Sequence, residues 1–156
     1  MVEEQGVRVH NRQEKRTLPE GFTGALEQCG DYALSLLNGP YRARVKLPEL
    51  VNVSLIDDAQ IRRVHAQFMD NPTPTDVITF PYGLEGEILI SIETAERQAL
   101  AFKASFEQEI LLYLIHGLLH LAGYDDSTST ERVEMEQVQK ALVDEVCQRS
   151  RGPFQG

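Results

Sequence analysis

Two histidines in an apolar stretch are the residues whose types and spacing could do chemistry. His116 and His120 lie in ILLYLIHGLLHLAGYDD, residues 110–126, which is otherwise almost wholly apolar before its last three positions. A helix turns once in 3.6 residues, so histidines four positions apart lie on one face, one turn above the other. This spacing is typical of two imidazole ligands that one helix presents to a metal ion.

The chain just after this helix could supply a third ligand. Gly123 predicts the end of the helix, because glycine adopts the left-handed conformation there without steric cost. The chain can then turn back and bring Asp126 toward the histidine face. Two imidazoles and one carboxylate make a three-ligand site with an open position, as a catalytic zinc requires. We therefore predict a site for one divalent metal ion, zinc above others, formed by His116, His120 and Asp126.

Asp126 also has a second interpretation, as a residue at the start of the next helix. Thr128 and Glu131 follow it with the spacing of a capping box. If Asp126 has only this structural role, Asp125 or the distant His65 becomes the candidate third ligand. A single histidine in an apolar helix is commonly a core residue, but the pair followed by a turn glycine and an acid favours a metal site.

Gly117, between the two histidines, bears on the reaction that such a site could catalyse. Glycine inside a helix costs about 1 kcal/mol relative to alanine, so we expect something to approach the helix closely there. Zinc peptidases with two histidines on one helix carry a glutamate, the general base, directly after the first histidine. Gly117 occupies that position and cannot take a proton. The sequence therefore disfavours a metallopeptidase-like hydrolase, which stays an alternative.

Three stretches of the chain resemble the YbeY family of bacterial endoribonucleases. HGLLHLAGYDD, residues 116–126, is similar to the family signature H-G-x-L-H-L-x-G-Y-D-H and departs from its fixed positions only at the last. PTDVITFPY, residues 74–82, resembles the family's P-T-D-V-L-S-F-P. GEILIS, from Gly86, resembles G-D-I-x-I-S, with Glu87 in place of the aspartate. The resemblance covers residues 50–145 well and the first 50 residues only in general layout.

Two departures from the family pattern leave a further alternative open. Asp126 stands where the family has its third metal-binding histidine. Met69 aligns with a family arginine thought to matter for activity, and Arg62 and Arg63 lie one or two helical turns earlier. Both departures are compatible with a catalytically weakened, ribosome-associated binding protein of the same fold.

The resemblance implies a function, partners and a substrate loop. It implies a metal-dependent endoribonuclease that cleaves single-stranded RNA, in 3′-end maturation of 16S ribosomal RNA and in ribosome quality control. The expected partners are ribosomal RNA and the small ribosomal subunit. The resemblance also implies that Thr75 and Asp76 lie beside the metal and bind substrate. An RNA substrate lowers the need for a strong base, because its 2′-hydroxyl can attack the phosphate internally.

Composition and charge restrict the class of protein. With 156 residues, 42% hydrophobic and 25% charged, the chain is typical of a soluble globular protein. We expect one domain over residues 1–150 and a loose tail over 151–156. The net charge of −9 disfavours broad, nonspecific binding of nucleic acid and leaves room for a local basic groove. Without a signal-peptide pattern, a membrane span or a CxxC motif, the sequence indicates a cytoplasmic protein in which Cys29 and Cys147 are free thiols.

The periodicity of apolar residues predicts the elements that must position these side chains. Strands are expected at residues 6–12, 50–56, 77–80 and 87–92. Helices are expected at 19–38, 59–68, 94–102, from Ser105 through the histidines, and at 130–147, where the apolar stripe is Val133, Val138, Leu142 and Val146. This order predicts an α+β domain, a small four-stranded mixed sheet with about five helices. The family resemblance adds a metal helix beneath the sheet, in a layout that resembles the metzincin peptidases.

Overall fold

A mixed sheet with helices packed on it forms the body of the protein. The computed structural model describes residues 6–39, 41, 43–69, 77–82, 85–150 and 154. The elements in these residues are β1 (Gly6–Asn11), α1 (Phe22–Leu37), β2 (Leu50–Ile56), α2 (Asp58–Met69), β3 (Val77–Tyr82), β4 (Glu85–Ser91), α3 (Ile92–Ala101), α4 (Phe106–Leu121) and α5 (Ser129–Arg149). The predicted α+β class is therefore correct.

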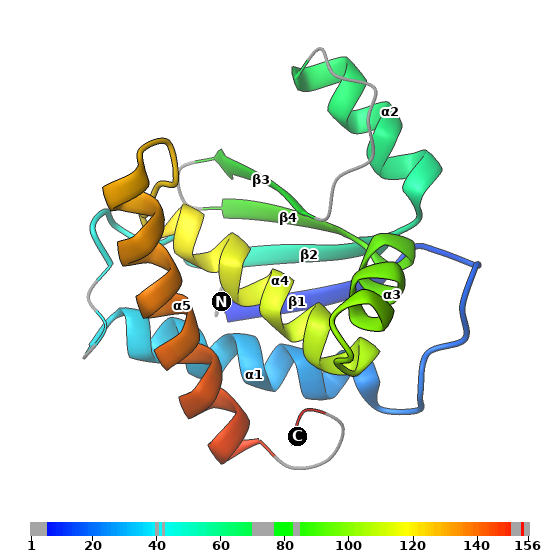
Figure 1. The fold of residues 1–156 in the computed structure, drawn as a ribbon, viewed down its shortest axis with the longest axis horizontal. Coiled ribbons are helices and arrows are strands. Elements are labelled where there is room, and N and C mark those ends of the chain that lie inside the picture. The colour runs from blue at the N-terminus through cyan, green and yellow to red at the C-terminus, as the bar shows by residue number, and fades with distance from the viewer. Residues whose placement is uncertain are drawn as a thin grey trace, which may run out of the picture.

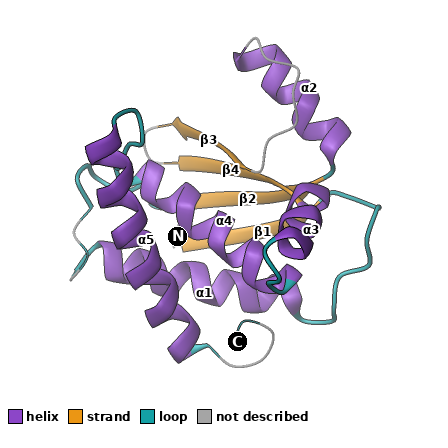
Figure 2. Cartoon of the chain, viewed as in Figure 1, coloured by secondary structure: helices purple, strands orange, loops and turns teal. Residues whose placement is uncertain are grey.

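The strands lie in the order β1-β2-β4-β3 (Figures 1 and 2). Three of them, β1, β2 and β4, run parallel, and β3 pairs with β4 in the antiparallel direction. Figure 1 shows α4 lying across the sheet with α1 and α5 beside it, whereas α2 extends away from the other elements. Parallel neighbours need a crossover connection, and α1 makes the one between β1 and β2, whereas α2 lies in the connection between β2 and β4.

The side chains of the central strands alternate between two apolar clusters of unequal size. The residues of β2 and β4 that enter the main core are fully buried: Val51, Val53, Leu55, Ile88 and Ile90. Ile56 and Leu89 point to the opposite face, because successive side chains of a strand alternate. There they form a small separate cluster with Ile61 of α2.

The carboxylate of Asp58 attaches α2 to α3 as well. The Asp58 carboxylate accepts hydrogen bonds from the Ser91 hydroxyl at 2.6 Å, the Thr94 hydroxyl at 2.8 Å and the Arg97 guanidinium at 2.6 Å. Burial alone would raise the pKa of Asp58, but the bonds from Arg97, Ser91 and Thr94 outweigh burial and lower the pKa below its ordinary value. The start of α2 is thereby tied to the start of α3.

Helix α4 has more buried residues than any other described helix, and it begins and ends as predicted. The Ser105 hydroxyl accepts from the Gln108 backbone N–H at 3.0 Å, and the Gln108 side chain returns a bond to Ser105, which completes a capping box. The helix ends before Gly123, whose φ of 96° lies in the left-handed region. The residues of α4 that are fully buried are Ile110, Leu111, Leu114, Ile115, Leu118 and Leu119.

Gly117 is a point at which α4 approaches the sheet closely, as its place in the helix predicted. A Cβ atom at this position would lie 2.9 Å from Ile88 Cδ1 and 3.0 Å from Ile88 Cγ2. Real Cβ atoms essentially never approach another carbon so closely. The glycine therefore lets α4 pack directly on β4.

The apolar face of α5 differs from the prediction. Val133 is 53% exposed, whereas Met135 is 2% exposed and shares the buried face with Leu142 and Val146. Each residue of a helix rotates by about 100°, so Val133 lies about 200° away from Met135 and faces the opposite side. Val138 is half-buried against the core. The predicted stripe was therefore wrong at its first position.

The expectation of a loose C-terminal tail is wrong at Phe154. This side chain is fully buried, and its ring centroid lies 5.6 Å from that of Phe22. Phe22 in turn lies 6.2 Å from Phe106, at the start of α4. The other residues of 151–156 lie outside the described residues. The tail is thus anchored, at this one residue, against the first turn of α1.

The structure also bears on the two cysteines and on membrane-spanning helices. Cys29 and Cys147 are both unpaired, and burial raises the pKa of the Cys29 thiol. None of the helices in the described part of the chain is long and apolar enough to cross a membrane.

Replacing Phe154 tests the anchoring of the tail. Phe154→Ala should lower the free energy of unfolding by about 3 to 5 kcal/mol, because a fully buried ring leaves a cavity. Phe102→Ala is the matched control, since Phe102 is 72% exposed, and should change stability by no more than about 0.5 kcal/mol. Urea denaturation measures both values. Equal stability of the two variants would show that the Phe154 contacts do not hold the tail.

A double-mutant cycle tests the close contact of α4 with β4. Gly117→Ala should destabilise the protein, because overpacking costs about 1 to 3 kcal/mol and outweighs the gain of about 1 kcal/mol in helix propensity. Ile88→Val removes Cδ1, the atom nearest the added Cβ. It should therefore cost less in the Gly117→Ala background than in the wild-type protein. Strictly additive free energies of unfolding would contradict the contact.

Candidate metal centre

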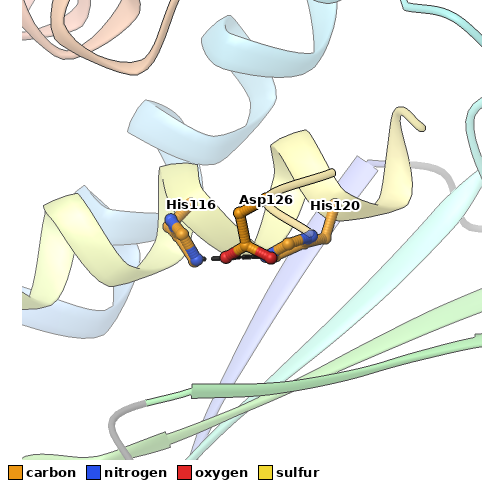
Figure 3. A group of neighbouring side chains, drawn as sticks. All are labelled: His116, His120 and Asp126. Carbon is orange, nitrogen blue, oxygen red and sulfur yellow. Dashed lines mark hydrogen bonds and ion pairs between the residues drawn. The ribbon is translucent and has the colours of Figure 1, made fainter. Parts of the chain in front are cut away.

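The two histidines of α4 and the aspartate after it converge on one small space. His116 and His120 lie one turn apart, and their Nε2 atoms are 3.1 Å from each other. The Asp126 Oδ2 atom lies 3.8 Å from His120 Nε2. One ligand atom from each of the three residues lies within 4.8 Å of the other two, and Figure 3 shows all three side chains pointing toward one another. Among the described residues, this is the one group of three or more such side chains that could hold a metal ion.

A tight turn after α4 brings Asp126 back to the histidines. The Gly123 N–H donates to the His120 carbonyl at 3.0 Å, and the Tyr124 N–H donates to the Leu119 carbonyl, also at 3.0 Å. These bonds satisfy carbonyls in the last turn of the helix, which have no partner within it. The buried Tyr124 ring then anchors the turn, since its hydroxyl donates to the Tyr41 carbonyl at 3.1 Å.

Thr128, and not Asp126, caps the start of the following helix. The Thr128 hydroxyl accepts from the Glu131 N–H at 3.1 Å, which makes Thr128 the N-cap of α5. The carboxylate of Asp125 is used within the turn, where it accepts from the Asp126 N–H at 2.7 Å and the Ser127 hydroxyl at 2.9 Å. Of the two neighbouring aspartates, Asp126 is therefore the one whose carboxylate faces the histidines.

Hydrogen bonds hold the imidazole rings on the side away from this space. His120 Nδ1 lies 3.2 Å from the Tyr124 carbonyl oxygen, and His116 Nδ1 lies 2.7 Å from Gln139 Oε1. A carbonyl oxygen can only accept, so His120 carries its proton on Nδ1 and leaves the lone pair of Nε2 for a ligand. Gln139 was missed by the sequence reasoning, because its contact with His116 is between different helices.

The electrostatic environment keeps the ring of His120 neutral. Burial, followed by the neighbouring His116, lowers the pKa of His120, and Asp126 offsets only part of this effect. Neutral imidazole is the form that binds metal ions. The position of His120 therefore suits a metal ligand at neutral pH.

Other predicted site residues lie elsewhere or outside the described part of the chain. Thr75 and Asp76 fall outside the described residues, so their place beside the metal stays a prediction. Met69 is the last residue of α2, which also carries His65, and neither belongs to the group of three ligands. Glu87 of β4 lines a groove of about 460 Å³ between α2 and the sheet.

The chain is similar in sequence to bacterial proteins that carry the same description, Endoribonuclease YbeY. A sequence model of the family described as Endoribonuclease YbeY matches residues 8–147. The chain is 43% identical over 81 residues to the Endoribonuclease YbeY of Chlorobium phaeovibrioides, a match that covers 49% of this chain and 55% of the relative. It is 36% identical over 114 residues to that of Persephonella marina, covering 67% of this chain and 72% of the relative.

The fold of the chain also resembles that of a solved structure. A solution structure of a Thermotoga maritima protein superposes with a TM-score of 0.63 at 29% sequence identity, and the match covers 92% of this chain and 90% of that one. The chain spans 55% to 59% of the length of the first curated relatives that it matches.

The family match includes every element that forms the candidate metal centre. Residues 8–147 contain α4, the turn after Gly123 and nearly all of α5. A match over most of the chain, with several relatives near 40% identity, leads to one conclusion. The chain belongs to the YbeY family.

Proposed function

We propose that this protein is a metal-dependent endoribonuclease that cleaves single-stranded RNA. Its proposed role is 3′-end maturation of 16S ribosomal RNA and ribosome quality control in the cytoplasm, with ribosomal RNA and the small ribosomal subunit as partners. Membership of the YbeY family supports the reaction class. The observation that supports the metal most directly is the convergence of His116, His120 and Asp126 within 4.8 Å.

The donor set suits a zinc ion. Two imidazole nitrogens and one carboxylate oxygen are the three protein ligands of many catalytic zinc sites, which keep a further position open. Metal-ligating histidines almost always donate the other ring N–H to a carbonyl or carboxylate, and the Tyr124 carbonyl provides such a partner to His120. His116, His120 and Asp126 would therefore hold the ion. Two ligands on one helix and a third after a glycine turn are arranged as in the metzincin layout.

The carboxylate of Asp126 tunes the charge of the site. A bound divalent ion would polarise a phosphoryl oxygen and neutralise the charge that develops on it. With two imidazoles and one carboxylate, the loaded site carries a net charge of about +1, against about +2 with three histidines. Asp126 thus weakens attraction to the RNA phosphate, and its hard oxygen favours manganese more than a third imidazole would.

The surroundings of Gly117 favour RNA over a peptide as the substrate. A peptidase of this layout needs a carboxylate base at this position, and any Cβ here would lie 2.9 Å from Ile88. RNA carries its own nucleophile in the 2′-hydroxyl, so its cleavage needs no base at position 117. The packing of α4 on β4 therefore opposes the metallopeptidase alternative.

A weakened, ribosome-associated binding protein is the second candidate function. Two sequence observations favour it, namely Asp126 at the family's third histidine and Met69 at the family's arginine. Such a protein would keep the fold and its affinity for ribosomal RNA and would cleave RNA slowly or not at all. The cleavage assay described below separates the two functions.

Metal content tests the ligand set. Protein purified without chelators should contain close to one zinc or similar ion per chain, measured by plasma mass spectrometry. His120→Ala and Asp126→Ala should lose most of it, since each removes a ligand, whereas Asp126→His should retain it. Asp125→Asn is the matched control, because the Asp125 carboxylate bonds within the turn. Equal metal content in the wild type and His120→Ala would refute the site.

An RNA cleavage assay tests the reaction. The metal-loaded protein should cleave a single-stranded RNA but spare the same sequence in a duplex. Chelation or His120→Ala should abolish cleavage, because both remove the positive charge that polarises the phosphate. A fully loaded wild type that binds the RNA without cleaving it would establish the binding protein in place of the endoribonuclease.

A further inference from the structure

A glutamine occupies the buried face of α5 where an apolar side chain would be expected. Met135, Leu142 and Val146 are the buried residues of this helix. Gln139 follows Met135 by four residues and precedes Leu142 by three, which is the spacing of one helical face. Its side chain is half-buried. A polar group on a packing face costs free energy unless it is hydrogen-bonded, so its partner indicates why it is there.

The partner of Gln139 is a ring of the candidate metal centre. Gln139 Oε1 lies 2.7 Å from His116 Nδ1, across the packed faces of α4 and α5. An amide oxygen accepts and cannot donate, so His116 is the donor through Nδ1–H. The proton on Nδ1 leaves Nε2 with a free lone pair, and that atom lies 3.1 Å from His120 Nε2.

We infer that Gln139 is a positioning residue that holds His116 in the Nδ1–H tautomer with Nε2 directed into the metal centre. The Tyr124 carbonyl does the same for His120, at 3.2 Å from its Nδ1. The two ligand rings are thus preset from two sides, one by the turn after α4 and one by α5. The consequence for metal affinity rests on the proposed function, whereas the tautomer of His116 does not.

Contacts on either side of Gln139 fix the helix that carries it. Glu134, five residues earlier, forms an ion pair with Arg44. The Arg44 guanidinium in turn lies 4.4 Å from the centroid of the Tyr124 ring, in the turn that bears Asp126. Leu142, almost one turn later, is fully buried. The register of α5 is therefore set independently of the Gln139 bond, which lets the helix impose an orientation on the imidazole.

Three variants separate this role from a structural one. Gln139→Leu removes the acceptor and extends the apolar face between Met135 and Leu142, so the midpoint of thermal unfolding should be unchanged or raised. Gln139→Glu keeps an acceptor oxygen at the same place. Gln137→Leu, at an exposed position two residues earlier, is the matched control.

Nitrogen-15 spectra of the histidine rings report the tautomer directly in metal-free protein. At about pH 8, His116 should be the Nδ1–H tautomer in the wild type, Gln139→Glu and Gln137→Leu. Gln139→Leu should lose this preference. A folded Gln139→Leu protein whose His116 remains fully in the Nδ1–H form would overturn the inference.

Zinc affinity, measured by competition with a chromophoric chelator, reports the consequence. Loss of an outer partner of a metal-ligating histidine typically lowers affinity by about 10- to 100-fold, and we expect this for Gln139→Leu. Gln139→Glu and the control should bind zinc at least as well as the wild type. Unchanged zinc affinity in Gln139→Leu would refute the inference and leave the proposed metal site intact. If the wild type binds no zinc while Gln139→Leu still loses the Nδ1–H preference of His116, the metal site alone would be refuted.

Discussion

The direct packing of α4 on β4 is the contact on which the rest of the structure depends. Gly117 has no side chain, so the helix lies against Ile88 without an intervening atom. With fully buried leucines and isoleucines on the remaining faces, α4 has no freedom to rotate about its axis. The direction in which His116 and His120 point is therefore set by apolar packing. The polar groups of the site refine an orientation that the core has already chosen.

The candidate centre combines a local part with one long-range contact. His116, His120 and Asp126 fall within eleven consecutive residues, and the turn bonds of Gly123 and Tyr124 bring the third of them back. Formation of this part needs only the last two turns of α4 and the turn after it. Gln139 belongs to another helix and reaches His116 only when α5 docks.

Sequence reasoning succeeded where one element carries the whole signal. The two histidines, the glycine stop and the Ser105 cap are local patterns, and the structure has each of them in the predicted place. It failed where a partner from another element decides the outcome. Phe154 is a single aromatic residue without periodicity, and only the proximity of Phe22 explains its burial. The face of α5 was misassigned because the buried set is interrupted by Gln139, whose polarity is satisfied from α4.

The attachments of α2 have a consequence for how the protein opens. Its apolar cluster with Ile56 and Leu89 is separate from the main core, and its polar contacts include the Asp58 carboxylate and a bond from the Gln60 side chain to the Arg12 carbonyl. These contacts can break while the main core stays intact, so α2 is a unit of local unfolding. Its amide hydrogens should exchange through an opening whose free energy is lower than that of global unfolding. The bonds to Asp58 lower the pKa of its carboxyl group in the folded protein. Their contribution to stability is therefore complete above the pKa that Asp58 has in the unfolded chain, and it is lost as the pH falls through the lower pKa of the folded state. Acidification below the ordinary carboxyl pKa should therefore release α2 before the sheet and α4 separate.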